Sequence, residues 1–166
     1  MSSDQKILSK KIAYRKIQRM AYEIVERNSD EKQIILAGIQ ESGLIIARVL
    51  HGFLKEIFHG EIIVIAINLD KKNPKNISLS EQINFDNKVV IITDDVANTG
   101  RTLLYALKPF IEFYPKKIQT LVLVERSHKE FPVSADYVGL SVSTALSEKI
   151  IVETDGPEII GAKIEF

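Results

Sequence analysis

The sequence predicts an α/β domain built on a doubly wound, mainly parallel sheet that is flanked by helices. Short apolar runs at 34–37, 62–67, 88–93 and 118–125 have the length of buried strands. Segments with apolar residues at helical spacing follow the first run and the third run, and strands that alternate with helices are typical of parallel sheets. A chain of 166 residues is expected to form one domain, covering 1–166.

The first predicted element is one basic amphipathic helix from about Gln5 to Asn28. Ile17, Met20 and Ile24 lie on one stripe at helical spacing. Two interpretations of its cations stay open, a solvated face and a local patch for an anion or RNA. These cations are Lys10, Lys11, Arg15, Lys16 and Arg19.

The strand at 34–37 is expected to end at Gly38, and residues 38–43 to link it to a second helix. That helix carries an apolar stripe of Leu44, Ile45, Ala47, Leu50, Leu54 and Ile57. After the strand at 62–67, residues 68–86 are polar. A loop this long in a compact domain is functional or disordered, and its place between two strands favours an active-site flap.

The helix after Thr99 is expected to point Leu103, Leu104, Leu107, Phe110 and Ile111 inward, and Tyr114-Pro115 to end it. Beyond Arg126 the pattern changes to short strands without helices, at 135–140, 150–152 and 159–164. These predict a small β-rich cap, antiparallel or mixed, over roughly 126–166.

Composition sets further expectations. There is no cysteine, which excludes disulfides and thiolate chemistry and fits a reducing compartment. Lys plus Arg equals Asp plus Glu at 22 each, so no global charge directs the chain to nucleic acid. No apolar stretch approaches the length of a membrane span. We expect a cytoplasmic protein without a membrane partner.

The most informative stretch runs from Val90 to Thr102. An apolar strand ends in Asp94 and Asp95, where a parallel sheet presents ligands. A short loop then leads into a helix, whose free N–H groups suit a phosphate. Gly100 lets the backbone approach closely, while ionised carboxylates accept from hydroxyls or hold a metal. Phosphate at one end and a diol at the other describe a ribose 5-phosphate.

Each of these features has a plainer interpretation. An Asp-Asp pair after a strand is often a solvated loop, and Thr-Gly before a helix is often an N-cap. Their joint order and spacing are far more specific. The stretch is not a Walker A loop, because no Gly-Lys-Ser/Thr follows.

Over these thirteen residues the chain resembles the phosphoribosyl pyrophosphate (PRPP) motif of type I phosphoribosyltransferases. Further stretches resemble one branch, the PyrR family of pyrimidine-operon regulators, which also has uracil phosphoribosyltransferase activity. The matching stretches are 20–28, the strand to Gly43, 94–102, 121–132, 135–139 and 147–148. The resemblance implies the type I fold and transfer of ribose 5-phosphate from PRPP to a nucleobase, most simply uracil, with release of pyrophosphate.

The resemblance also implies roles for particular residues. Asp94 and Asp95 are the expected catalytic pair. Magnesium is the expected cofactor, held chiefly by PRPP oxygens, with no protein ligand assigned. Two loops are expected to bind PRPP: Val96, Ala97, Asn98, Thr99, Gly100, Arg101 and Thr102 around the 5-phosphate, and Gln40, Glu41, Ser42 and Gly43 around pyrophosphate.

This chain departs from the family at the pyrophosphate loop. The family typically has Lys-Thr-Arg-Gly where this chain has Gln40-Glu41-Ser42-Gly43. This loop therefore lacks the cations that bind pyrophosphate in the family. Ser42 cannot make the two parallel, charge-assisted hydrogen bonds that an arginine makes to a phosphate. Relatives often have a strained or cis peptide here, so we expect unusual backbone at Gln40–Glu41. The family's flap signature is missing too, although Lys71 or Lys72 would supply point charges.

Asn98 stands where purine-specific relatives usually have Asp, and an amide is no general base, which argues against a purine. The base is expected near Val96, Ala97 and residues 135–143. Alternatives are an RNA-binding regulator and a PRPP or nucleotide sensor without turnover. Several cations of the family's RNA face are absent, which weighs against RNA. A homodimer is expected, because relatives are generally dimers or tetramers.

Overall fold

A six-stranded sheet forms the centre of the computed structural model, which describes residues 4–166. The strand order is β4-β3-β2-β5-β6-β7, and all strands except the edge strand β4 run parallel. The strands are β2 (Gln33–Ile39), β3 (Glu61–Leu69), β4 (Ile77–Leu79), β5 (Val89–Ala97), β6 (Lys117–Arg126) and β7 (Tyr137–Val142). The order reverses between β2 and β5, which makes their carboxyl ends the topological switch point.

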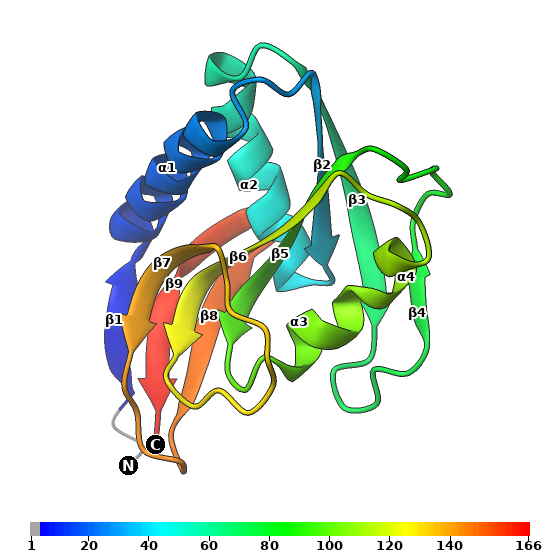
Figure 1. Cartoon of the computed structure of the whole chain (residues 1–166). Helices are drawn as coiled ribbons and strands as arrows, with labels where there is room; N and C mark the ends of the chain where they lie inside the picture. Colours follow the sequence, from blue (N-terminus) through cyan, green and yellow to red (C-terminus); the bar gives the residue numbers. More distant parts are fainter. Residues whose placement is uncertain (1–3) are drawn as a thin grey trace.

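Helices cover both faces of this sheet, as the doubly wound prediction requires (Figure 1). The longer pair, α1 (Lys10–Arg27) and α2 (Ser42–Ile57), packs on one face, over Leu36 and Ile91. The shorter pair, α3 (Arg101–Ala106) and α4 (Lys108–Ile111), packs on the other face, over Ile35 and Ile92. Consecutive residues of β2 and β5 are therefore buried on opposite faces, which explains their unbroken apolar runs.

The prediction of one helix from Gln5 to Asn28 was wrong at its beginning. Residues Gln5–Ser9 form a strand, β1, and α1 begins at Lys10. Ser9 is the N-cap, and its hydroxyl accepts from the backbone N–H of Ile12 at 3.2 Å. This cap places the boundary, since a serine at the N-cap satisfies a free N–H of the first turn.

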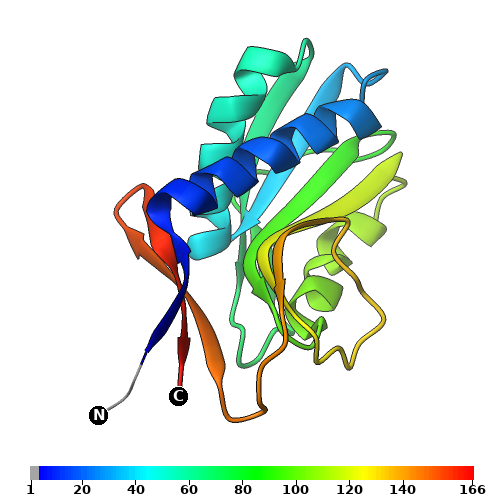
Figure 2. The same ribbon diagram turned by 90° about the vertical axis from the view of Figure 1, so that its left-hand side faces the viewer.

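A second, antiparallel sheet has the order β1-β9-β8, with β8 at Lys149–Asp155 and β9 at Glu158–Glu165 (Figure 2). The predicted cap is thus partly wrong. Its first strand, β7, pairs in parallel with β6 and extends the main sheet. The small sheet instead recruits β1 from the other end of the chain, because its register with β9 buries Leu8 beside Ala162.

Two smaller predictions were also wrong. Residues 68–86 are not all loop, because β4 pairs with the end of β3, and Ser80 Oγ accepts from Ala66 N at 2.8 Å. Ile111 does not point inward and is 64% exposed. The helix is broken at Leu107 between α3 and α4, so the stripe extrapolated from Leu103 does not continue to Ile111. Within residues 4–166 no helix is long and apolar enough to cross a membrane.

Candidate functional site

The two loops singled out in the sequence lie next to each other at the switch point. Gly38 of β2 pairs with Thr93 of β5, so residues 40–43 and 96–102 leave the sheet side by side. Thr93 Oγ1 donates a buried hydrogen bond of 2.7 Å to the carbonyl oxygen of Gly43. A Cβ on Gly43 would lie 2.5 Å from Thr93 O, so only glycine permits this approach.

The β2–α2 loop contains a cis peptide bond between Gln40 and Glu41, which confirms the expected unusual backbone there. Gln40 N donates to Ile67 O of β3 at 3.0 Å, and this bond fixes the loop to the sheet edge. The side chains of Gln40 and Glu41 are exposed. Residues 40–43 contain no cation, so any anion here would rely on backbone N–H groups and on charges from elsewhere.

The acid pair lies inside β5 rather than in the loop after it. Asp94 is buried, with 1% of its side chain exposed, and Asp95 is 18% exposed. Lys71, from the segment between β3 and β4, bridges them: its Nζ lies 3.0 Å from Asp94 Oδ1 and 3.2 Å from Asp95 Oδ1. Asp94 Oδ2 is buried and has no hydrogen-bond partner in the structure. The pair thus retains an unused polar atom inside the protein.

Burial and the neighbouring charge act differently on the two acids. Desolvation, with repulsion from Asp95, raises the pKa of Asp94 to about 8. Desolvation also opposes ionisation of Asp95, but attraction to Lys71 and hydrogen bonds from its neighbours outweigh it and lower the pKa of Asp95. Near neutral pH the pair therefore carries about one negative charge, which Lys71 balances.

The expected phosphate loop lines a cavity of about 310 Å³ together with Lys71 and Asp94. Gly100 has φ +88°, in the left-handed region that favours glycine. Thr99 Oγ1 accepts from Arg101 N at 3.3 Å, and Thr99 O accepts from Glu130 N and Phe131 N at 2.9 Å. α3 has only six residues and contributes little helix dipole. An anion at this turn would therefore be bound by the N–H groups of the turn itself.

The cavity's lining brings together most of the residues predicted from the sequence. It contains Lys71, Asp94, Val96, Ala97, Asn98, Thr99, Gly100, Arg101, Thr102 and Leu103. Asp95 and residues 40–43 are outside this lining, although the Thr93–Gly43 bond keeps the 40–43 loop beside it. Sequence reasoning missed the position of Lys71, which it placed only as a point charge for pyrophosphate. No local pattern pairs residue 71 with residues 94 and 95.

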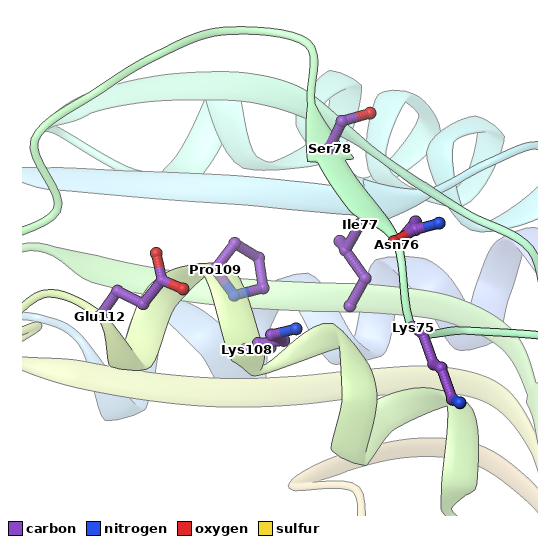
Figure 3. Close-up of a pocket in the computed structure, with 7 residues that line it drawn as sticks. All are labelled: Lys75, Asn76, Ile77, Ser78, Lys108, Pro109 and Glu112. Atoms are coloured by element: carbon purple, nitrogen blue, oxygen red, sulfur yellow. The ribbon is translucent and has the colours of Figure 1, made fainter.

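A slightly larger hollow, about 370 Å³, lies between β4 and α4 (Figure 3). Lys75, Ser78, Lys108 and Glu112 are among its lining side chains. None of the sequence-predicted site residues lines it. Size alone therefore does not identify the candidate site; the acid pair and the glycine turn do.

The expected base region lies at the carboxyl ends of β5, β6 and β7. Ala97 pairs with Glu125, and Glu125 pairs with Ser141, whose hydroxyl donates to Glu125 Oε2 at 3.1 Å. His128 Nε2 lies 2.6 Å from Thr144 O, which ties the two loops beyond these strands together. This edge thus offers polar groups beside the apolar side chains of Val96 and Ala97.

Among residues 4–166, no group of three or more His, Asp or Glu side chains is arranged to hold a metal ion. The donor set that exists, two adjacent carboxyls with one unpartnered oxygen, fits magnesium shared with a phosphorylated ligand. Mg²⁺ usually keeps several waters and takes one or two carboxylates beside substrate phosphates.

These features place a polar cavity, with an acid and a glycine turn in its lining, at the switch point of a mainly parallel sheet. A family model described as "Phosphoribosyl transferase domain" matches residues 3–158. The chain therefore belongs to the phosphoribosyltransferase family, in its PyrR branch.

Two relatives illustrate the similarity to the PyrR branch. A Haemophilus ducreyi protein named "Bifunctional protein PyrR" is 36% identical over 151 residues, covering 85% of this chain and 84% of its own. A Streptococcus mutans protein of the same name is 39% identical over 144 residues, covering 83% and 81%.

Solved structures with the same fold include hypoxanthine phosphoribosyltransferases. A mutant of the Trypanosoma cruzi enzyme, complexed with the product IMP, has a TM-score of 0.79 at 17% identity, covering 95% of this chain and 83% of that one. A Staphylococcus aureus enzyme has a TM-score of 0.73 at 13% identity, covering 89% and 81%. At this level of identity the likeness shows the fold alone.

Proposed function

We propose that the chain transfers ribose 5-phosphate from PRPP to a pyrimidine base, uracil, and releases pyrophosphate. One observation carries the proposal: Asp94, the buried member of the acid pair, and the glycine-containing turn at residues 98–102 line the same cavity at the switch point. These are complementary partners for a diol and a phosphate at the two ends of one ribose 5-phosphate.

The proposed roles follow from that complementarity. The N–H groups and hydroxyls of Thr99 and Thr102, with the turn at Gly100, hold the 5-phosphate. Asp94 and Asp95 accept hydrogen bonds from the ribose hydroxyls and stabilise positive charge that develops at the anomeric carbon. Magnesium, when bound, neutralises pyrophosphate oxygens and helps pyrophosphate to leave.

The proposed base site is bounded by Val96 and Ala97 and by the polar ends of β6 and β7. Asn98 is exposed and cannot act as a general base, which supports a pyrimidine over hypoxanthine or guanine. Transfer to N1 of uracil releases the N1 proton to solvent, so residue 98 is not required as its acceptor.

A panel of nucleobases with PRPP and magnesium, followed by pyrophosphate release, tests this function. We expect turnover with uracil and none with hypoxanthine or guanine. Turnover restricted to purines would refute the pyrimidine assignment. An anion-soaked crystal gives a second test, since sulfate or phosphate should occupy the turn at Thr99–Thr102; an empty turn beside other occupied anion sites would count against the assignment.

A sensor without turnover is the second candidate, and the absence of a cation from residues 40–43 favours it. Tight PRPP or nucleotide binding with no turnover of any base would support this candidate.

RNA binding has less support from the basic face of α1. Arg19 pairs with Glu23 and donates to the carbonyls of Val138 and Gly139, while Lys10 pairs with Glu158 at 2.7 Å. Both cations thus stabilise the fold itself. Salt-dependent binding to a structured RNA, weakened by charge reversal at Lys11 and Arg15, would restore this candidate.

A homodimer and a cytoplasmic location belong to the same proposal. Ile12 and Tyr22 on α1 are large side chains that are 39% and 56% exposed, and aromatic residues such as Tyr22 are enriched in interfaces. Light scattering at about ten micromolar protein, a test of roughly micromolar affinity, should give twice the monomer mass. A monomer under those conditions would contradict the dimer.

A further inference from the structure

Lys71 occupies the position that the proposed function assigns to the ligand. Its ammonium lies 3.0 Å from Asp94 and 3.2 Å from Asp95, on the same carboxyl groups that would accept from the ribose hydroxyls. The ammonium contacts Oδ1 of both acids, and the remaining oxygen of Asp94, Oδ2, is buried away from solvent. The ammonium and a ribose diol therefore compete for Asp94 and Asp95.

The segment that carries Lys71 also borders the pyrophosphate loop. β3 ends at Leu69 and β4 begins at Ile77. Between them, a shallow hollow is lined by Asp70 together with Gln40, the first residue of the pyrophosphate loop. Lys71, the next residue after Asp70, is thus anchored beside both parts of the candidate site. The flexible side chain of Lys71 can therefore extend toward the acid pair or toward the pyrophosphate loop.

The energetics favour exchange rather than a permanent ion pair. The side chain of Lys71 is 44% exposed and can swing toward solvent, whereas Asp94 is buried and must gain the ribose hydroxyls as new partners when the ammonium leaves. Residues 40–43 contain no cation, whereas a bound pyrophosphate would bring several negative charges there. A displaced Lys71 would therefore move toward unbalanced negative charge.

We propose that Lys71 is an exchangeable cation with two positions. In the empty site it balances Asp94 and Asp95; when PRPP binds, the ribose hydroxyls displace it, and it then pairs with pyrophosphate beside Gln40. This inference rests on the proposed function. In this scheme Lys71 replaces the cation that the pyrophosphate loop lacks. Lys71 becomes available only after Asp94 and Asp95 have bound the ribose hydroxyls.

Binding of two ligands that differ only in pyrophosphate tests the exchange. Wild type, Lys71→Gln and the matched control Lys72→Gln are titrated by calorimetry with ribose 5-phosphate and with PRPP, each with magnesium. Lys72 is the neighbouring exposed lysine, and its recorded bond to Asp70 comes from its backbone N–H, so the control keeps the local turn.

We expect Lys71→Gln to change the two affinities in opposite directions. Ribose 5-phosphate should bind about two- to fivefold more tightly, because no half-exposed ion pair has to be broken. PRPP should bind about ten- to a hundredfold more weakly, the range for one charge-assisted hydrogen bond. Lys71→Arg should keep most of the PRPP affinity, and Lys72→Gln should leave the ratio of the two affinities near that of wild type.

The outcomes separate this inference from the function on which it rests. If wild type binds both ligands but Lys71→Gln weakens both, or changes neither, the exchange is refuted and the PRPP site stands. An equal effect of Lys72→Gln would also refute it, since general charge rather than one position would be responsible. If wild type binds neither ligand, the proposed function and the inference both fail.

Discussion

The buried carboxyl of Asp94 should make the ligand-free protein less stable as the pH rises. Its pKa is raised from an ordinary 3.8 to about 8, so between these values the folded state holds a proton that the unfolded state has released. Stability falls with pH wherever the folded state binds more protons. We expect Asp94→Asn, which keeps the shape but cannot ionise, to remove this dependence.

The magnitude follows from the proton count. Between about pH 5 and about pH 7, nearly one extra proton stays on the folded state, and each pH unit then costs about 1.4 kcal/mol. Wild type should therefore lose about 2–3 kcal/mol relative to Asp94→Asn across this interval. Asp95, whose pKa is lowered, and Lys71, whose pKa is raised, are ionised in both states there and add no slope.

Urea unfolding of both proteins at the two pH values measures the difference. Asp30→Asn is the matched control, because this exposed carboxyl lies before the amino end of β2, at the opposite edge of the sheet from the acid pair, and its removal should keep the wild-type slope. Asp95→Asn should instead flatten the slope, since repulsion from Asp95 helps to raise the pKa of Asp94. Parallel pH dependence of wild type and Asp94→Asn would show that Asp94 is ionised in the folded protein and would refute the assignment of the proton.

Three further predictions concern the loops and the chemistry. Asp94→Asn and Asp95→Asn should each reduce turnover by about a hundred- to thousandfold and weaken PRPP binding less, because positive charge in the transition state favours the ionised form of Asp94 as well as of Asp95; full turnover by both, in steady-state assays with an identified base, would end the enzyme hypothesis. Ser42→Arg should tighten pyrophosphate binding in calorimetry, since it restores a cation to the loop; an unchanged affinity would mean that the loop faces away. Gly43→Ala should destabilise the fold by about 1–3 kcal/mol in urea unfolding, because the new Cβ would lie 2.5 Å from a backbone oxygen of β5. Gly52→Ala, on the same helix with nothing within 4 Å of the new Cβ, is its control and should be neutral or stabilising.

Much of the main sheet was predictable because its strands are buried on both faces. Short apolar runs such as 34–37 and 118–125 have the length and the β-branched composition of central strands, and the order of strands and helices then places two loops at the switch point. The candidate site follows from those loops, whose types of residue reflect local chemistry: small residues for a close turn, acids for a diol.

The elements that were missed depend on partners far away in the sequence. Residues 5–9 have no strand signal of their own and become β1 only through pairing with β9. β7 joins β6 in parallel without an intervening helix, which the alternation of strands and helices does not predict. The contact of Lys71 with the acid pair likewise joins residues that are far apart in the sequence. It forms only when β3 and β5 lie in the same sheet.

The pairing of β1 with β9 has a consequence for synthesis on the ribosome. α1 is among the first elements to be made, yet part of its inner surface is covered by β9, where Ile159 N donates to Tyr14 Oη at 3.4 Å. β9 follows every other described element in chain order. The inner surface of α1 that packs against β9 therefore stays exposed until this last strand has been synthesised and has docked.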